Sequence, residues 1–108
     1  MNMVYQIPLQ LGIHSTYKGY HYLVSALEIA LEHEENLVLY SKVIFPAVAH
    51  KYHTNTCCVE RDIRTVIRHC WNSPCRETLQ SISPYVLQRQ PTVGEFIDIL
   101  YWHIKFLE

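Results

Sequence analysis

The stretch from residue 50 to residue 69 concentrates the side chains that could hold a metal ion or bind an anion. Its sequence, HKYHTNTCCVERDIRTVIRH, places Cys57 and Cys58 side by side, with three histidines and four lysines or arginines around them. Thiolates and imidazoles are ligands that zinc accepts, whereas guanidinium and ammonium groups bind phosphates and the edges of bases. The residue types therefore allow two interpretations: a metal site, or a helix that contacts an anionic polymer.

The spacing of the candidate ligands disfavours a metal site. The residues of a permitted type are His50, His53, Cys57, Cys58, His69, Cys70 and Cys75. No Cys-x-x-Cys pair occurs among them, and helical spacing places Cys70 on the apolar face of its helix. Buried cysteine usually acts as a small hydrophobic residue. We therefore expect neither a bound metal nor another cofactor.

The adjacent cysteines could also serve as a nucleophile or a redox sensor. Cys57 and Cys58 lie at the expected start of a helix, beside arginines, which is a setting that activates thiols. However, no histidine can be assigned as their partner from the sequence, and polar residues near a helix start need no catalytic role. We therefore expect that the protein is not an enzyme.

The arginines of this stretch fall on one side of a helix predicted over residues 56–72. Its apolar face carries Val59, Ile63, Val66, Ile67 and Cys70. Because successive residues of an α-helix turn by about 100°, Arg61, Arg64 and Arg68 group together on the opposite face. Arginine can pair bidentately with phosphate or with guanine, and Glu60 could accept a hydrogen bond from a cytosine amino group. An ordinary solvated helix face shows the same pattern.

The cationic charge is concentrated in the middle of the chain, although the net charge is −1. Residues 40–76 contain six lysines and arginines against two acidic residues, which gives +4. Residues 1–39 contain one lysine against four glutamates, giving −3, and residues 77–108 contain two basic against four acidic residues, giving −2. Binding to an anionic polymer requires a local cationic segment of this kind.

Apolar residues recur at helical spacing along most of the chain, and no alternating strand pattern competes with them. This periodicity predicts helices over about 18–33, 37–52, 56–72 and 76–82, and a final helix after the capping box of Thr92 and Glu95. Pro46 falls inside the second of these, so either the helix bends there or a new helix begins at that proline. Pro8 and Gly12 leave room for only a short or broken helix at the start. The prediction is an all-α fold, a compact bundle of about five or six helices.

The two central helices have the spacing of a helix-turn-helix. Only His53, Thr54, Asn55 and Thr56 separate them, which is a turn length that this motif uses. Small Ala49 in the first helix permits a close approach of the two axes. The usual turn glycine is missing, although Asn55 is a residue that tolerates a left-handed conformation. Short connections are also common in helical bundles of other kinds.

Three segments in the same order, YKGYHYL, FPAVAHKYHTNTCCVERDIR and PTVGEFIDILYWHIKFLE, closely resemble the DNA-binding effector domain family of stage 0 sporulation protein A. That protein is the response regulator that starts endospore formation. The resemblance runs from about residue 5 to the C-terminus, with a shortened loop before Pro91. It implies a helical bundle whose helix-turn-helix reads the major groove, tandem copies of the domain on DNA, and contact with RNA polymerase.

By this resemblance, the helix starting near Cys57 is the recognition helix, and three of its residues match family residues that face the DNA. These three are Glu60, Arg61 and Arg64. The full set of predicted DNA-binding residues is Glu60, Arg61, Arg64, Thr65, Arg68, Cys58, Lys51 and Thr54. Double-stranded DNA is therefore the expected partner, bound by a homodimer or by tandem copies of the domain.

Three positions depart from the family pattern. Cys58 stands where the family has a base-contacting arginine, Cys57 where it has a serine at the helix cap, and Thr65 where it has a histidine. A thiol cannot form the forked contact to guanine, and it caps a helix weakly. These departures imply a different target sequence, and a specific affinity lower by about 1–3 kcal/mol for the lost bidentate contact.

The chain contains neither a secretory signal nor a membrane-spanning stretch, so we expect a cytoplasmic protein with reduced cysteines and no membrane partner. We expect residues 1–108 to form a single helix-turn-helix domain, without room for the family's receiver domain. Control by abundance, dimerisation or a partner would then replace phosphorylation. The alternative function is an interaction module or antagonist that keeps the family's packing but has lost specific DNA reading, as Cys58 and the low net charge would favour.

Overall fold

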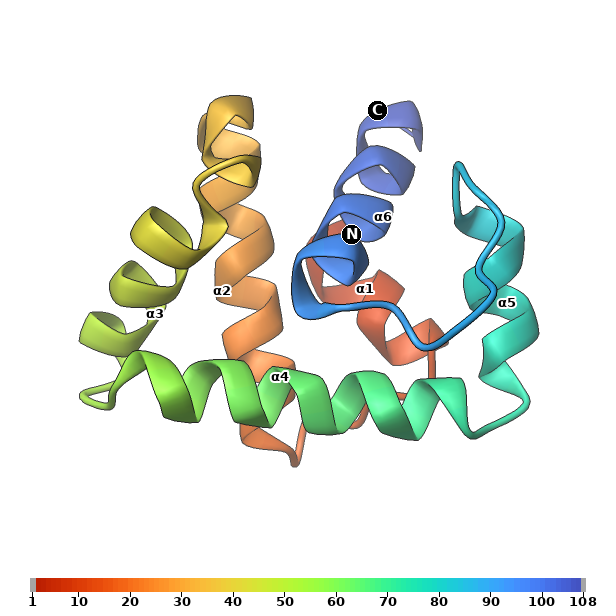
Figure 1. Cartoon of the computed structure of the whole chain (residues 1–108), viewed down its shortest axis with the longest axis horizontal. Coiled ribbons are helices and arrows are strands. Elements are labelled where there is room, and N and C mark those ends of the chain that lie inside the picture. Colours follow the sequence, from red (N-terminus) through yellow and green to blue (C-terminus); the bar gives the residue numbers. More distant parts are fainter. Residues whose placement is uncertain (1, 108) are drawn as a thin grey trace.

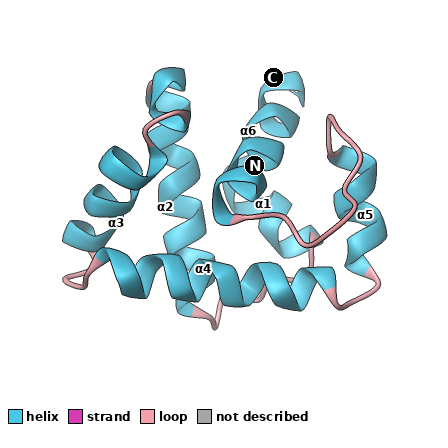
Figure 2. Cartoon of the chain, in the orientation of Figure 1, coloured by secondary structure: helices cyan, strands magenta, loops and turns pink. Residues whose placement is uncertain are grey.

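Over residues 2–107 the chain folds into six α-helices joined by turns and short irregular segments (Figure 1, Figure 2). The computed structural model describes residues 2–107, so Met1 and Glu108, the ends of the predicted domain, lie outside the described residues. The elements are α1 (Met3–Gln10), α2 (Lys18–Glu32), a 3₁₀ turn (Glu34–Leu37), a π turn (Tyr40–Ile44), α3 (Phe45–Lys51), α4 (Thr56–Trp71), α5 (Cys75–Ile82) and α6 (Val93–Leu107). No strand occurs among residues 2–107, and the predicted all-α bundle is confirmed.

Helix α4 lies across one end of the other helices. Figure 1 shows it along the lower edge of the view, with α3 at its N-terminal end and α5 at its C-terminal end. It packs against α2, α3, α5 and α6. The side chains that it buries are Val59, Ile63, Val66, Ile67 and Cys70. This is the apolar face that the periodicity predicted, and each aliphatic side chain so buried contributes about 1.5–3 kcal/mol.

Helices α2 and α4 come into close contact at Gly19. A Cβ atom at this position would lie 2.2 Å from the carbonyl oxygen of Asp62 and 2.8 Å from Cγ1 of Val66. Since both distances are shorter than any normal contact of a carbon atom, only glycine allows the backbone of α2 to lie against α4 in this way. Gly19 therefore fixes how α4 is seated on the core.

The proline inside the predicted helix over 37–52 marks a helix start. The π turn ends at Ile44, α3 begins at Phe45, and Pro46 occupies the first turn of α3. A proline costs little there because the first amide groups of a helix have no partner within the helix. Of the two predicted arrangements, a bend or a new helix at Pro46, the second is found. The result is a short α3 that ends directly before the turn to α4.

The capping box predicted for the last helix is present. Oγ1 of Thr92 accepts a hydrogen bond from the backbone N–H of Glu95 at 3.1 Å, and Oε1 of Glu95 accepts one from the N–H of Thr92 at 2.8 Å. This backbone hydrogen bond, followed by the guanidinium of Arg89, lowers the pKa of Glu95. The two reciprocal bonds satisfy amide groups that a helix start otherwise leaves free.

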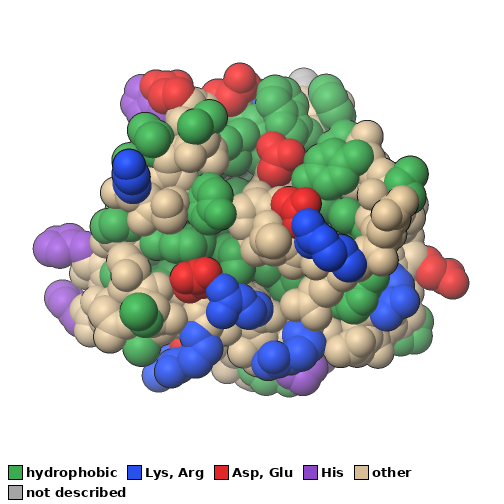
Figure 3. Space-filling view, viewed as in Figure 1, with side chains coloured by type: hydrophobic (Ala, Val, Ile, Leu, Met, Phe, Trp, Pro, Cys, Tyr) green, Lys and Arg blue, Asp and Glu red, His purple; other side chains and the backbone are tan. Residues whose placement is uncertain are grey.

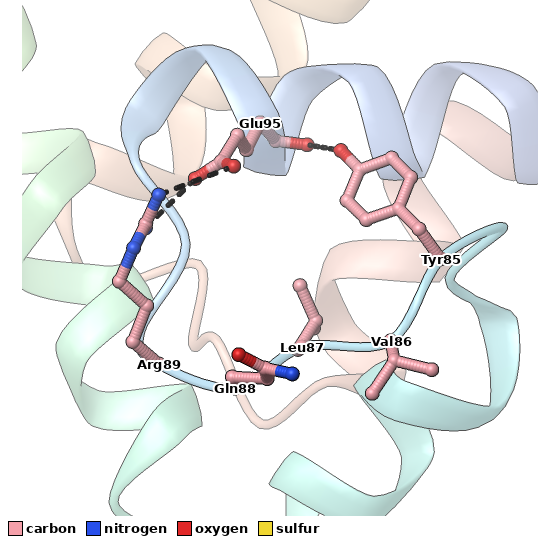
Figure 4. A pocket seen from close by; sticks show the side chains of 6 residues that line it. All are labelled: Tyr85, Val86, Leu87, Gln88, Arg89 and Glu95. Atoms are coloured by element: carbon pink, nitrogen blue, oxygen red, sulfur yellow. Dashed lines mark hydrogen bonds and ion pairs between the residues drawn. The ribbon is translucent and has the colours of Figure 1, made fainter.

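The segment before Pro91, which lacked a clear pattern in the sequence, forms a loop that closes on the start of α6 (Figure 4). Nη1 of Arg89 pairs with Oε1 of Glu95 at 3.0 Å, and the Tyr85 hydroxyl donates to Oδ2 of Asp98 at 3.3 Å. Leu87 points into the ring of side chains between them. The loop borders a cavity of about 390 Å³. The Tyr85 hydroxyl also lies 3.4 Å from the carbonyl oxygen of Glu95, and together these polar contacts hold the loop against α6.

The phenol of Tyr85 should make stability depend on pH in alkaline solution. Burial, and next the carboxylate of Asp98, raises the pKa of Tyr85 from 10.0 to about 12. The folded state therefore holds this proton more tightly than the unfolded chain, and the associated stability is present below pH 10 and lost as the pH rises towards 12. We expect Tyr85→Phe to lose less free energy of unfolding than the wild type over this range, as measured by urea unfolding. Tyr5→Phe is the control, and parallel pH curves for Tyr85→Phe and wild type would contradict the assignment.

Candidate nucleic-acid interface

Helix α4 begins with an asparagine cap. Oδ1 of Asn55 accepts a hydrogen bond from the backbone N–H of Cys58 at 2.9 Å, and Asn55 itself has the extended backbone of an N-cap, with φ −121° and ψ 166°. The expectation that Cys57 occupies the cap is therefore wrong. Cys57 is the second residue of the helix and is exposed. A good cap residue holds the start of α4, so the weak capping ability of a thiol has no consequence here.

The turn between α3 and α4 is closed by two backbone hydrogen bonds. The N–H of Thr54 donates to the carbonyl oxygen of Ala49 at 2.9 Å, and the N–H of His53 donates to that of His50 at 3.3 Å. This pair of bonds defines a Schellman motif, in which the residue after the helix is left-handed. That residue is His53, with φ 54°, whereas Asn55, which also tolerates this conformation, is extended. Histidine is one of the few side chains that tolerate it.

The outward face of α4 carries the cluster that the sequence predicted. Its members are Glu60, Arg61, Arg64, Thr65 and Arg68. The side chains of Arg61 and Arg64 are 67% and 53% exposed, so both guanidinium groups can be reached from solvent. Figure 3 shows lysine and arginine side chains gathered along the lower edge of the molecule, where α4 runs in Figure 1. We call the set of Glu60, Arg61, Arg64, Thr65 and Arg68 the α4 face.

Ion pairs within α4 orient these arginines without burying them. Arg64 pairs with Glu60 one turn earlier, and Nε of Arg61 lies 3.3 Å from Oδ1 of Asp62. The hydrogen bond to Asp62 raises the pKa of Arg61 above its ordinary value, so Arg61 is charged at every physiological pH. Exposed pairs of this kind are worth about 0–1 kcal/mol. Both arginines can therefore exchange these partners for a phosphate or a base at little cost.

Thr65 and Arg68 extend the α4 face by a further turn. Oγ1 of Thr65 donates to the carbonyl oxygen of Arg61 at 3.0 Å, and Nη2 of Arg68 lies 3.5 Å from the same hydroxyl. Cys58, at the other end of the face, is half-buried. Its side chain lies near Arg61. The structure thus brings six of the eight predicted residues to one side of α4.

The other two predicted residues lie on the α3 side of the turn. Nζ of Lys51 donates to Oγ of Ser25 at 3.2 Å and lies 5.4 Å from the ring centre of Tyr52. The Tyr52 hydroxyl is 3.2 Å from the same Ser25 oxygen, so Lys51 is tied to α2 by a small network. Thr54 is half-buried. These two residues border the α4 face and do not belong to it.

Three residues that position the α4 face were not identified from the sequence as doing so. Asn55 was assigned to the turn, although asparagine is also a preferred N-cap residue and this signal was present. His53 carries no comparable signal, because left-handed histidine is uncommon. Gly19 matters only because Asp62 lies against it, and no local pattern relates two residues so far apart in the chain.

The candidate metal ligands do not converge. Within residues 2–107, no group of three or more histidine, cysteine or acidic side chains is arranged to hold a metal ion. His50, His53 and Cys57 are exposed around the turn, whereas Cys70 is buried near Cys75 at the other end of α4. The cysteines are all free thiols. The exposed ligand types at the turn, His50, His53 and Cys57, are thus not arranged as a metal site.

The four thiols should differ strongly in reactivity. Burial, assisted by nearby Cys75, raises the pKa of Cys70 to about 12, whereas Cys57 is exposed at the start of α4. Because the thiolate is the reactive form, we expect iodoacetamide to label Cys57 rapidly at about pH 8 and to label Cys70 only after unfolding. Mass spectrometry of peptides from a time course measures both rates, and labelling in urea gives the control. Equal labelling of the two cysteines in the folded protein would contradict the buried position of Cys70.

None of the described helices is both long enough and apolar enough to cross a membrane. The sequence matches the protein family described as Sporulation initiation factor Spo0A C terminal over residues 4–104. This match spans all six α-helices of the described residues apart from the first residue of α1 and the last three residues of α6, and it includes the turn and the whole α4 face. The family comprises DNA-binding domains of a transcription regulator of sporulation, which are not enzymes. The chain therefore belongs to the Spo0A C-terminal family of DNA-binding effector domains.

Proposed function

We propose that this domain binds specific sequences of duplex DNA by placing α4 in the major groove. The observation that carries the proposal is the two-sidedness of α4, which buries one apolar stripe and turns Glu60, Arg61, Arg64, Thr65 and Arg68 to solvent. An α-helix fits the major groove, and the N-terminal part of a recognition helix is the part that reaches base edges. The residues of that part are Cys58, Glu60, Arg61 and Arg64.

The proposed roles follow from position along α4 and from side-chain chemistry. Arg61 and Arg64 are assigned to guanine edges or to phosphates, because a guanidinium group can fork to either. Glu60 is assigned to a cytosine amino group once Arg64 has left it. Thr65 and Arg68, one turn further along, are assigned to the sugar–phosphate backbone, which most protein–DNA hydrogen bonds contact.

The residues that border the α4 face have smaller proposed roles. Lys51 and Thr54 would contact phosphates at the turn, and Lys51 must first leave Ser25. Cys58 cannot fork to guanine, so the target sequence is proposed to differ from that of relatives with arginine at this position. We also propose that residues 1–108 act as one domain in the cytoplasm, that copies bind in tandem or as a homodimer, and that the bound domain contacts RNA polymerase.

Selection from a random duplex pool tests sequence-specific binding. Pools are bound at low salt, recovered and sequenced, and the enriched duplex is compared with a shuffled duplex in a salt titration. For a protein that neutralises Z phosphates, the logarithm of the binding constant falls with the logarithm of salt with a slope of about −0.9Z. We expect an enriched sequence, a steep slope for both duplexes, and tighter binding to the enriched one.

The same experiment separates this function from that of an interaction module. Two ion pairs on α4 already compensate part of the arginine charge, which is the observation in favour of such a module. If neither duplex binds at low salt, specific DNA reading is excluded and the interaction module is left. Binding to both duplexes with equal affinity would mean contact with phosphates alone.

A further inference from the structure

The turn that leads into α2 lies beside the α4 face. In Figure 1 the lower end of α2 and the chain before it reach below α4, at the same edge of the molecule. The ring of Tyr17 stacks on that of His69 with their centres 5.6 Å apart and their planes 9° from parallel. Two residues further on, Gly19 lies against the backbone of α4. Residues 14–18, which we call the α2 turn, are thus held alongside the recognition helix.

The α2 turn is exposed and carries no negative charge. Its residues are His14, Ser15, Thr16, Tyr17 and Lys18, and all five are exposed. No aspartate or glutamate occurs in the sequence before Glu28. None of the ion pairs among residues 2–107 involves Lys18. The turn therefore offers a lysine, a histidine and three hydroxyl groups within five residues, which together suit an anion.

The α2 turn is also braced in place. Nε2 of His21 lies 2.7 Å from the carbonyl oxygen of Ser15, and the N–H of Tyr17 donates to the carbonyl oxygen of His14 at 3.1 Å. With the Tyr17–His69 stack, these contacts fix the turn at both of its ends. The backbone that carries Lys18 and Thr16 is consequently held in place, which reduces the loop ordering that binding would otherwise cost.

A hollow separates the α2 turn from α4. Its volume is about 220 Å³. It is lined by Thr16, Tyr17, Lys18, Gly19, Asp62, Thr65 and Val66. The one carboxylate in it, that of Asp62, pairs with Arg61 on the α4 side. An anion would therefore be bound by Lys18 and Thr16 on the wall that the α2 turn forms, because the hydroxyl of Thr65 on the opposite wall already donates to the carbonyl oxygen of Arg61.

The dimensions of DNA determine what reaches this hollow. The major groove is about 12 Å wide, and an α-helix with its side chains is about 10–12 Å across. A helix seated in the groove therefore fills its width, and a segment packed against the side of that helix lies over the sugar–phosphate backbone. The α2 turn is such a segment, so phosphates rather than base edges would face it.

We propose that the α2 turn is a second DNA-contacting surface, in which Lys18 and Thr16 bind phosphates of the strand that borders the major groove. The inference rests on the proposed seating of α4 in that groove. Phosphates carry no sequence information, so this contact would add affinity and fix the position of α4 without changing which sequence is preferred. It supplies a cationic contact outside the segment 40–76 that holds most of the basic residues.

Substitution of Lys18 tests the second surface. Lys18→Ala and Lys18→Glu are compared with Lys105→Ala, which removes an exposed lysine from the last turn of α6, at the far end of the molecule from α4 (Figure 1). We expect Lys18→Ala to lower the salt slope by about 0.9, the value for one phosphate, equally for the enriched and the shuffled duplex. Lys18→Glu should weaken binding further, and Lys105→Ala should leave both slopes unchanged. Thermal unfolding verifies that each variant is folded.

Ethylation interference locates the phosphate. One phosphate at the edge of the site should weaken wild-type binding when it is ethylated, and should no longer do so in Lys18→Ala. If Lys18→Ala and Lys18→Glu match Lys105→Ala while Arg61→Ala and Arg64→Ala lose binding, the second surface is refuted and the role of α4 stands. If the wild type fails to bind DNA at all, the proposed function fails, and this inference fails with it.

Discussion

Arg61→Ala and Arg64→Ala should each weaken binding to the enriched duplex by about 5- to 150-fold, the equivalent of the 1–3 kcal/mol that a bidentate base contact provides. Both side chains are more than half exposed, and their pairs with Asp62 and Glu60 contribute little to stability. The thermal unfolding midpoint should therefore stay nearly unchanged. Fluorescence anisotropy with labelled duplex measures the first quantity, and circular dichroism measures the second.

Ile63→Ala is the complementary variant. Ile63 is fully buried on the opposite face of the same helix, so its truncation should cost about 2–5 kcal/mol of stability. Binding by the fraction that remains folded should be retained, because Ile63 does not reach the α4 face. If Arg61→Ala or Arg64→Ala destabilised the fold as much as Ile63→Ala does, the arginines would be structural residues.

Gly19→Ala should destabilise the protein by about 1–3 kcal/mol or more, as expected for overpacking in a core. The sign is informative, since replacing glycine by alanine within a helix otherwise stabilises by about 1 kcal/mol. The reversal comes from the 2.2 Å separation that the new Cβ would have from the carbonyl oxygen of Asp62. Backbone atoms on both sides have little freedom to move away. Urea unfolding at constant temperature measures the change.

Gly94→Ala is the matched control for Gly19→Ala. A Cβ atom at Gly94 would lie 2.7 Å from the ring of Tyr40, at the far end of a side chain that can swing aside. We expect a smaller loss of stability than for Gly19→Ala. If the two variants were equally stable, or if Gly19→Ala gained stability, the close seating of α4 on α2 would be wrong.

The helices could be predicted where burial follows from local spacing. In α2, α4 and α6 the apolar residues repeat with the helical period, and the predicted ranges agree with the structure to within a residue or two. The outward position of Arg61 and Arg64 follows from the same periodicity, because the face opposite an apolar stripe must meet solvent. For this reason the sequence alone predicts which residues of α4 face solvent.

Contacts between distant parts of the chain could not be predicted in the same way. Lys51 was expected to be free for DNA, yet it bonds to Ser25, which lies 26 residues earlier. The α2 turn comes to lie beside α4 through the stacking of Tyr17 on His69, more than 50 residues apart in the chain. The spacing of residues along the chain indicates neither contact, because each depends on how whole helices pack.

The Schellman turn at His53 has a consequence for the speed of association. Its two backbone hydrogen bonds fix the chain between α3 and α4, and the N-cap hydrogen bond of Asn55 fixes the start of α4. Helices α3 and α4 therefore have a fixed relative orientation before they reach DNA, and binding does not have to order the turn between them. Capture should accordingly be governed by diffusion and by charge, with rates that fall as ionic strength increases.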